Sequence, residues 1–481
     1  MASALASLLS RLSAAPLAGR RPVFLVGGVV RDLLLGREPR DVDILMEAGP
    51  RERGGLLHAL REALGTEPVV FDRRPPVTYR FVSEGAAIDA SFCEAGGLTE
   101  ELERRDFTIN AMAVPLGAAS RAVEDAGGTA RARQGLAQQV IDPLGGLPDL
   151  AAGRIAPSTA RSIRDDPLRM LRAVRLEATL PRFEITPALA AEIAAGAARL
   201  RETAVERISA EMTLILGSRR AGPALRRMDA LGLLATVLPE LEPLRGLRQP
   251  PRHHDHDALS HTLLAVQEAD GLSEGCEALR TAPLCADATL VLKWAALLHD
   301  AGKAATARVG PDGVPRFHGH ESVSSALAEE TLRRLRVPTR IAEPAKTLVS
   351  MHLRLGALAS AGAGDRPLMR LVRAAGDLLP LLALLALADR HASGGEGAAQ
   401  GEAALVEVAC RALRLREEFE ASGGERPLLD GDEVMSILGI PAGPRIGSIL
   451  RWLGRLRAEG RLAKKEEAVA LLKGLPPPRF R

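Results

Sequence analysis

The sequence predicts an α/β domain at the amino end, followed by a chain that is α-helical almost to its last residue. Short apolar runs, which are typical of strands, occur in the first part of the chain at residues 23–26, 42–45, 69–71, 79–82 and 87–92. They alternate with turns and with two helical patterns, at residues 29–35 and 51–64. From about residue 160, apolar positions recur at helical spacing. Aromatic residues make up only 2% of the chain, so burial depends on Leu, Ala and Val, which favours helices.

The chain of 481 residues is too long for a single compact core, and its length suggests about three domains. Pro- and Gly-rich breaks in the helical part give finer boundaries, near residues 239–252, 308–315, 393–402 and 421–431. We therefore expect an α/β head at 1–150, a helical neck at 151–245, a His-rich helical domain at 246–395 and a helical tail at 396–481.

The net charge of +3 and the pI of about 8.8 are compatible with a nucleic-acid partner but do not identify one. The four cysteines, Cys93, Cys276, Cys285 and Cys410, form no CxxC pair, which argues against a cysteine zinc site and structural disulfides and favours the reducing cytoplasm. The longest apolar stretch, 378–388, is far shorter than the ~20 residues of a membrane span, so we expect none. Residues 1–20 resemble an organelle transit peptide, but we favour a leading helix packed on the first strand.

A glycine turn and two aspartates carry the strongest chemical signal in the head. Gly27 and Gly28 stand between an apolar strand and a helix, where the backbone can approach a phosphate chain closely, and Arg31 follows one turn later. Asp41 and Asp43 are two residues apart, so on a strand both carboxylates lie on the same face. Such a pair suits Mg²⁺, and a two-metal site can activate a hydroxyl and stabilise a leaving pyrophosphate.

A third carboxylate should come from a neighbouring strand, and Asp89 in the run Ala-Ile-Asp-Ala-Ser is the natural choice. An isolated Asp-x-Asp pair is common on solvated loops, and a glycine pair before a helix is equally weak. Their order along residues 24–45 is far more specific. The run GGVVRDLLLGREPRDVDIL resembles the signature of the class II tRNA nucleotidyltransferase and bacterial poly(A) polymerase family, within the polymerase β-type superfamily. The resemblance implies an α/β nucleotidyltransferase head with catalytic Asp41, Asp43 and Asp89.

Two further runs resemble motifs of this family in the same order. RRDFTINAMA at 104–113 matches a block that implies contacts to the incoming nucleotide from Arg105, Asp106 and Asn110, the first two at its ribose. Residues 142–150 resemble the flexible hinge motif of the family. The strand that carries Asp89 departs from the family, which commonly has Arg at its end.

RDDPLRMLRAVR at 164–175 resembles the motif with which the family reads the incoming base. The resemblance implies that Asp166 and Arg169 act as a protein template for C and A, because a carboxylate accepts from an exocyclic amine and arginine donates to ring acceptors. Arg172 and Arg175 follow on the same helix and should also bind nucleotide. Asp165 stands where the family usually has Glu. Taken alone, the run would be an N-cap aspartate followed by a basic helix face.

Six possible metal ligands follow in order through the middle of the chain: His261, His299, Asp300, His320, His352 and Asp389. Histidine is the commonest ligand for transition metals, and carboxylates beside it give a mixed N/O site for one or two ions. The run HDAGK at 299–303 resembles the HD phosphohydrolase family. That resemblance implies a divalent transition metal or Mg²⁺, a phosphatase or cyclic phosphodiesterase activity, and Lys303 near the phosphate; His253, His254 and His256 are expected at the surface.

Residues 429–450, Gly460 and the run KKEEA at 464–468 resemble the RNA-facing segment of the nucleotidyltransferase family, and the basic residues of this tail could line tRNA phosphates. They are Arg451, Arg455, Arg457, Arg461, Lys464 and Lys465. The simpler interpretation is a solvated amphipathic helix.

The resemblance therefore implies an enzyme that adds C, C and A from CTP and ATP to the 3′ end of tRNA without a nucleic-acid template. Addition of CC only or of A only, or poly(A) synthesis, stays open because these activities share the motifs. A different class of function is a hydrolase whose HD domain does the main chemistry while the head binds nucleotide. The oligomeric state stays open.

Overall fold

The computed structural model describes residues 2–15, 22–39, 41–72, 77–83, 85–125, 135–250, 256–270, 284, 286–394, 398–421, 428–441, 443–458, 461–462 and 464–474. The chain packs as two compact units, Met1–Ser218 with Ala224–Val237 and Arg219–Pro223 with Leu238–Arg481. His253, His254, Cys276 and Cys285 lie outside the described residues, as do the side chains of Arg451 and Arg455.

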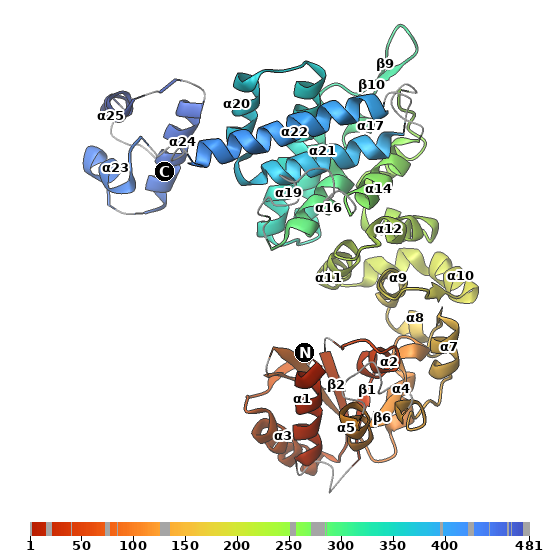
Figure 1. The fold of residues 1–481 in the computed structure, drawn as a ribbon. Helices are drawn as coiled ribbons and strands as arrows, with labels where there is room; N and C mark the ends of the chain where they lie inside the picture. Colours follow the sequence, from red (N-terminus) through yellow and green to blue (C-terminus); the bar gives the residue numbers. More distant parts are fainter. Residues whose placement is uncertain are drawn as a thin grey trace. The chain divides into compact units, whose positions relative to one another are not determined.

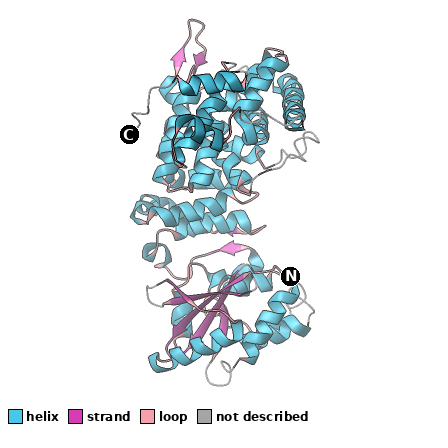
Figure 2. Cartoon of the chain, turned by 90° about the vertical axis from the view of Figure 1, so that its left-hand side faces the viewer, coloured by secondary structure: helices cyan, strands magenta, loops and turns pink. Residues whose placement is uncertain are grey.

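A six-stranded mixed sheet forms the centre of the first unit (Figure 1, Figure 2). Its strands are β1 (Val23–Val26), β2 (Asp41–Glu47), β3 (Val69–Asp72), β4 (Thr78–Ser83), β5 (Ala86–Cys93) and β6 (Ala113–Pro115), in the spatial order β3-β4-β5-β2-β1-β6. β2 and β5 run parallel, and the other neighbours run antiparallel. The expected α/β head is confirmed, and all five expected strands form.

Strand alternation gives this sheet two different faces. Helices α1 (Ala2–Ala14), α3 (Pro50–Leu64) and α5 (Leu116–Asp125) bury their apolar residues in one core together with Val42 and Ile44 of β2. Leu45 packs on the opposite side, against α4 (Leu98–Glu103). Because Val42 and Ile44 point into the first core, Asp41 and Asp43 point to the opposite face. The leading helix is confirmed, with Leu9 and Leu12 of α1 fully buried, but it packs mainly on α5 and α3 instead of on the first strand.

Other short helices of the first unit lie between the strands or after them. They are α2 (Gly28–Leu34), η1 (Thr108–Asn110), α7 (Gly146–Ala152), α8 (Ser162–Asp165), α9 (Arg169–Thr179), α10 (Pro187–Gly196), η2 (Ala197–Glu202), α11 (Val205–Leu216) and α13 (Leu233–Val237), with β7 (Arg154–Ile155) parallel to β8 (Glu184–Ile185). Helix α12 (Ala221–Ala230) joins the two units in sequence. The apolar residues of α9 are buried, which leaves Arg169, Arg172 and Arg175, at a spacing of three, along another face.

The second unit is almost entirely helical (Figure 1). Its elements are η3 (Pro239–Leu244), α14 (Ala258–Glu268), α16 (Ala288–Leu298), α17 (Lys303–Thr306), the hairpin β9 (Arg308–Val309) and β10 (Pro315–Arg316), α18 (His320–Arg334), α19 (Thr339–Ser360), α20 (Asp365–Ala375), η5 (Gly376–Leu378), α21 (Leu379–Ser393) and α22 (Ala398–Ala421). Helices α14, α16, α19 and α21 pack on one another around the histidines. The Asp257 side chain begins α14 by accepting a hydrogen bond from the Ser260 N–H, at 2.8 Å.

One stretch, Asp365–Ser393, is long enough to cross a membrane and contains a window of 18 residues with a mean hydropathy of 1.9. However, 72% of its most apolar window is buried inside the protein. Helix α21 is buried along nearly its whole length. The stretch is therefore mostly buried, as core helices are.

The tail has a small core of its own. Helices α23 (Gly431–Leu438), α24 (Pro444–Ala458) and α25 (Lys465–Lys473) enclose Leu429, Val434 and Leu453. Of its basic residues, Lys465 forms an ion pair with Glu433. The expectation of free cysteines holds for the buried Cys93 but is wrong for Cys410, which is disulfide-bonded, because cysteines far apart in sequence can meet in the fold.

Candidate functional site

Three carboxylates of the head lie on adjacent strands beside one cavity of about 550 Å³. Asp43 on β2 lies directly opposite Asp89 on β5 in the parallel register, and Asp41 precedes it on the same face. Burial raises the pKa of Asp43; the Arg105 guanidinium opposes this shift, and the charges of Asp89 and Asp41 add to it. A cation among these oxygens would relieve both burial and repulsion, and the donor set fits Mg²⁺.

Arg80 on β4 holds Asp89 through a two-pronged ion pair. Its Nε and Nη2 donate to the two carboxylate oxygens at 2.7 and 2.6 Å. The antiparallel register places Arg80 opposite Asp89, so the pair follows from strand pairing. Our sequence prediction missed Arg80, although alignment of the two strands on either side of Gly85 would have suggested it.

Gly27 makes room for Arg105 beside the carboxylates. Its φ is +82°, and a Cβ atom there would lie 2.0 Å from Arg105 Nη1 and 2.8 Å from Asp43 Oδ2. Arg105 Nη1 donates to Asp43 Oδ2 at 3.4 Å. The first glycine of the turn therefore admits a side chain of the protein, and Gly28 lines the cavity itself.

A chain of polar contacts crosses the cavity wall. Arg31 Nη1 donates to Asn110 Oδ1 at 2.6 Å, and Asn110 Nδ2 donates to Asp106 Oδ1 at 2.9 Å. Arg172 Nε lies 3.2 Å from Asp106 Oδ2, while Arg175 Nε donates to Glu211 at 2.7 Å. Burial would raise the pKa of Asp106, but Arg172 and Asn110 outweigh it and hold the pKa below the usual value. Asp106 is therefore a charged anchor that orients these groups.

The two expected base readers lie in different surroundings. Arg169 lines the cavity, and its Nη1 donates to the Arg105 carbonyl at 3.2 Å and to Ser162 Oγ at 2.9 Å. Asp166 does not line the cavity. It accepts two hydrogen bonds from Arg207, at 3.2 and 2.7 Å. Arg207 was not predicted, because nothing in the local sequence links it to a residue so far away.

The cavity thus brings together most of the residues expected in the head. They are Gly28, Arg31, Asp41, Asp43, Asp89, Arg105, Asp106, Asn110, Arg169, Arg172 and Arg175. Among the expected residues, Gly27 and Asp166 are not in its lining.

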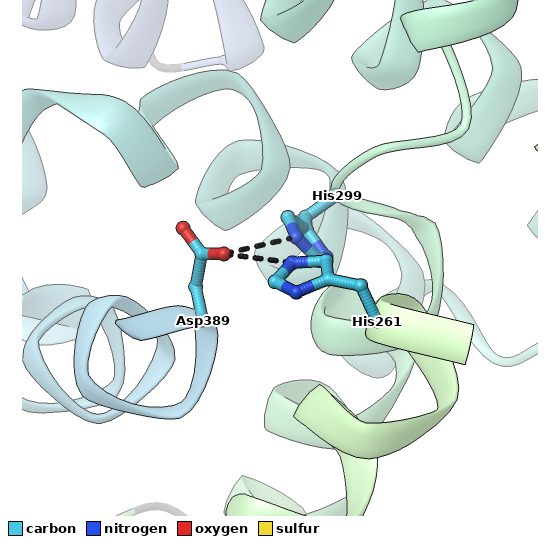
Figure 3. Close-up of side chains that lie close together, drawn as sticks. All are labelled: His261, His299 and Asp389. Atoms are coloured by element: carbon cyan, nitrogen blue, oxygen red, sulfur yellow. Dashed lines mark hydrogen bonds and ion pairs between the residues drawn. The ribbon is translucent and has the colours of Figure 1, made fainter. Parts of the chain in front are cut away.

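The second unit brings all six expected metal ligands into one cluster, in which five are buried and Asp389 is partly exposed. Two groups form, His261 with His299 and Asp389, and Asp300 with His320 and His352. Within each, the possible ligand atoms lie within 4.8 Å of one another. Asp389 reaches from α21 toward the two imidazoles of the first group, with Oδ1 3.0 Å from His261 Nε2 and 3.5 Å from His299 Nε2 (Figure 3).

The imidazole orientations suit metal binding. Each ring directs Nε2 into the cluster and Nδ1 to a backbone carbonyl, at Ala392 for His261, Ala296 for His299, Phe317 for His320 and Val349 for His352, over 2.7 to 3.2 Å. A carbonyl only accepts, so Nδ1 carries the hydrogen and leaves the Nε2 lone pair for a metal when the ring is neutral.

Asp300 joins the two groups. Its Oδ2 lies 3.1 Å from His299 Nε2, and its Oδ1 lies 3.2 Å from His320 Nε2. Lys303 Nζ also contacts Asp300 Oδ2, at 2.6 Å, and donates to Gln249 Oε1 at 2.7 Å. Burial lowers the pKa of His299, but Asp300 and Asp389 outweigh it and raise the pKa to about 10. A protonated His299 beside these carboxylates supplies the positive charge that a bound metal cation would supply. The two groups of donors fit two divalent ions, one in each group.

Three family models match the chain. The model described as the Poly A polymerase head domain matches residues 23–156, and that described as the probable RNA and SrmB-binding site of polymerase A matches residues 182–244. The HD domain model matches residues 253–394.

Curated relatives align along nearly the whole chain. An A-adding tRNA nucleotidyltransferase of Deinococcus radiodurans is 35% identical, with 93% of this chain and 94% of the relative covered. A CC-adding tRNA nucleotidyltransferase of Thermus thermophilus is 34% identical, with 94% and 93% covered. A multifunctional CCA protein of Cupriavidus necator is 33% identical over 69% of this chain and 75% of its own.

Solved structures share the fold. A Thermotoga maritima CCA-adding enzyme complexed with tRNA has a TM-score of 0.54 at 20% identity, covering 98% of this chain and 94% of its own. A Bacillus stearothermophilus CCA-adding enzyme in complex with CTP has a TM-score of 0.56 at 22% identity, covering 97% and 95%.

Proposed function

This chain belongs to the family of tRNA nucleotidyltransferases and poly(A) polymerases, and we propose that it adds C, C and A from CTP and ATP to the 3′ end of cytoplasmic tRNA. The observation that supports this most is the single cavity in which Asp41, Asp43 and Asp89 face the arginines of α9. Mg²⁺ ions held there would supply charge for the triphosphate and activation of the 3′-hydroxyl. The new bond joins that oxygen to the α-phosphorus, and pyrophosphate leaves.

Selection of C and A is assigned to Asp166 and Arg169. Cytosine and adenine both carry an exocyclic amine where uracil and guanine carry a carbonyl, so a carboxylate acceptor favours the first two. The two hydrogen bonds from Arg207 and one from the Leu168 N–H orient Asp166, and Oδ2, which among the described residues accepts only from Arg207 Nη2, keeps a lone pair for such an amine.

The test incubates the purified protein with Mg²⁺ and one of three tRNAs, which end at the discriminator base, at C, or at CC. Each nucleoside triphosphate is supplied separately. We expect C on the first two and A on the third, with no UMP or GMP incorporated, and no product from Asp43→Asn. Absence of incorporation on all three tRNAs would contradict the proposal.

Partial specificity is the second candidate, because two relatives that align along nearly the whole chain are named A-adding and CC-adding. The same assay separates these activities: extension of only the CC end by A, or a stop at CC, replaces full CCA addition. Extension with ATP on every end would indicate a poly(A) polymerase.

For the HD domain we propose a metal-dependent phosphohydrolase activity on nucleotide or tRNA-end phosphates. Water supplies the oxygen of the new P–O bond, and the ester oxygen leaves with a proton. His299→Ala should abolish phosphate release and spare nucleotide incorporation, whereas Asp41→Ala should do the reverse. If Asp41→Ala leaves the principal activity intact, the protein is a hydrolase with a nucleotide-binding head.

A further inference from the structure

The HD cluster opens into a cavity of about 720 Å³, and one side chain in its wall has no role yet. Arg390 directly follows the metal-ligand candidate Asp389 on α21. Ala386, Asp389, Arg390 and Ser393 all line the cavity. These positions follow the i, i+3, i+4, i+7 spacing of one helix face, so Arg390 points to the same side as Asp389.

Arg390 differs from the other cations of this cavity. Lys303 is held by Asp300 and Gln249, and Arg316 donates to Asp312 at 2.9 Å. Arg390 is half-buried and forms no hydrogen bond or ion pair with any residue that the structure describes. Its neighbour His391 is held elsewhere, by Glu402 at 3.0 Å. A half-buried guanidinium without an anion, beside a metal cluster, has its donors available for a ligand.

Gly401 of α22 lies against the guanidinium of Arg390. A Cβ atom at this glycine would lie 1.9 Å from Arg390 Nη2, 2.6 Å from Cζ and 3.1 Å from Nε. The guanidinium therefore lies directly against the backbone of α22, where only glycine leaves room for it. Gly401 also lines the cavity. The backbone of α22 therefore limits the positions open to the guanidinium before a ligand arrives, which reduces the entropy lost on binding.

We propose that Arg390 binds the phosphate group of the HD-domain substrate, a nucleoside phosphate, and that Gly401 positions it. Arginine matches phosphate because its planar fork donates two parallel charge-assisted hydrogen bonds. The phosphate would lie between Arg390 and the six metal-ligand candidates. This inference rests on the proposed phosphohydrolase site.

The primary test is calorimetric binding of inorganic phosphate to the full-length protein loaded with Mn²⁺. Arg390→Ala should weaken binding about 10- to 100-fold, the usual loss for a charge-assisted pair, with Mn²⁺ content unchanged. Arg390→Lys should lie between it and the parent. Gly401→Ala should weaken binding several-fold, since its Cβ displaces only the flexible end of Arg390. Arg366→Ala, at an exposed arginine of α20, is the matched control and should bind as the parent does.

Hydrolysis of a nucleoside 3′-monophosphate and of a nucleoside 2′,3′-cyclic phosphate gives a second measurement. The rates of the parent on the two compounds identify the preferred ester, and Arg390→Ala should raise the KM for that ester. Equal phosphate affinity of Arg390→Ala and the parent overturns the inference, and so does a metal-loaded parent that binds no phosphate. A parent that binds phosphate through Arg390 but hydrolyses neither ester contradicts the proposed hydrolysis, while it supports the binding site.

Discussion

Gly27 shows how one residue without a side chain controls the geometry of the nucleotidyl-transfer site. Gly27→Ala introduces a Cβ atom 2.0 Å from Arg105 Nη1 and places alanine at a φ of +82°. We expect an unfolding penalty of about 1–3 kcal/mol from the backbone and a loss of incorporation of at least about tenfold from the displaced Arg105. Chemical denaturation and a tRNA incorporation assay measure the two effects.

The control is Gly65→Ala. Gly65 has a φ of +67°, but nothing lies within 4 Å of its Cβ position. Gly65→Ala should also lower the free energy of unfolding, but it should keep full nucleotide incorporation. Unchanged incorporation in Gly27→Ala would exclude the Arg105–Asp43 contact from catalysis.

His299 gives a pH-dependent prediction. Because its pKa lies at about 10 without metal, the ring is charged at pH 7.5 and must lose its proton to become a ligand. Metal binding should therefore release a proton, and apparent affinity should rise with pH until the pH approaches 10. Calorimetry of Mn²⁺ binding in two buffers of different ionisation enthalpy counts the protons.

The sign also applies to stability without metal. The raised pKa of His299 stabilises the folded state fully at pH values below 6.5, the pKa of the unfolded chain. This contribution to the free energy of unfolding is lost as the pH rises toward 10. His391→Gln, a control outside the metal-ligand cluster, should leave unchanged the number of protons released when Mn²⁺ binds. Metal binding without proton release would mean that His299 is already neutral.

At the scale of elements, α7 and η1 form a close backbone contact. A Cβ atom at Gly146 would lie 2.3 Å from the Thr108 carbonyl oxygen and 2.8 Å from Met112 Cγ. Asp142 accepts hydrogen bonds from the Gly146 and Leu147 N–H groups at 2.6 and 2.8 Å, so the segment is tied on both sides. Gly146→Ala must shift backbone and should cost about 1–3 kcal/mol in the free energy of unfolding.

Gly54→Ala is the comparison for Gly146. Gly54 lies inside α3 with nothing within 4 Å of its Cβ position. Alanine there should stabilise the protein by about 0.5–1 kcal/mol. Chemical denaturation should thus give opposite signs for the two substitutions; equal signs would contradict the close contact at α7.

The same elements explain what the sequence could predict. Alternation along β2 predicts that Asp41 and Asp43 share a face, and the helical spacing of Arg169, Arg172 and Arg175 predicts one basic face, because both patterns are local. Arg80, Arg207 and Gln249 were missed because their partners Asp89, Asp166 and Lys303 come from other elements. Strand register and helix packing decide those pairs, and neither leaves a local pattern.

At the scale of the whole molecule, the two compact units carry separate sites and should respond to separate ligands. Both tryptophans, Trp294 and Trp452, belong to the second unit, so their fluorescence reports its unfolding alone. Mn²⁺ at about a hundred times its Kd should stabilise that unit by about 2.7 kcal/mol, which corresponds to a rise in Tm of about 5–10 °C.

CTP with Mg²⁺ should instead raise the Tm of the first unit, measured by circular dichroism. The Tm measured by tryptophan fluorescence should not change. His299→Ala should remove the first shift, and Asp43→Asn the second. A tryptophan transition that follows CTP would show that the two units unfold together.

The parallel pairing of β2 with β5 has a consequence for the chain during synthesis. Asp41 and Asp43 emerge early, but Asp89 can join them only after the chain through α3, β3, β4 and β5 has emerged. The arginines of α9 emerge later still. A ribosome-bound chain that ends within the sheet therefore cannot hold a nucleotide, and this non-local pairing is slow to form. Binding of CTP to nascent chains of increasing length should begin only once α9 has left the ribosome.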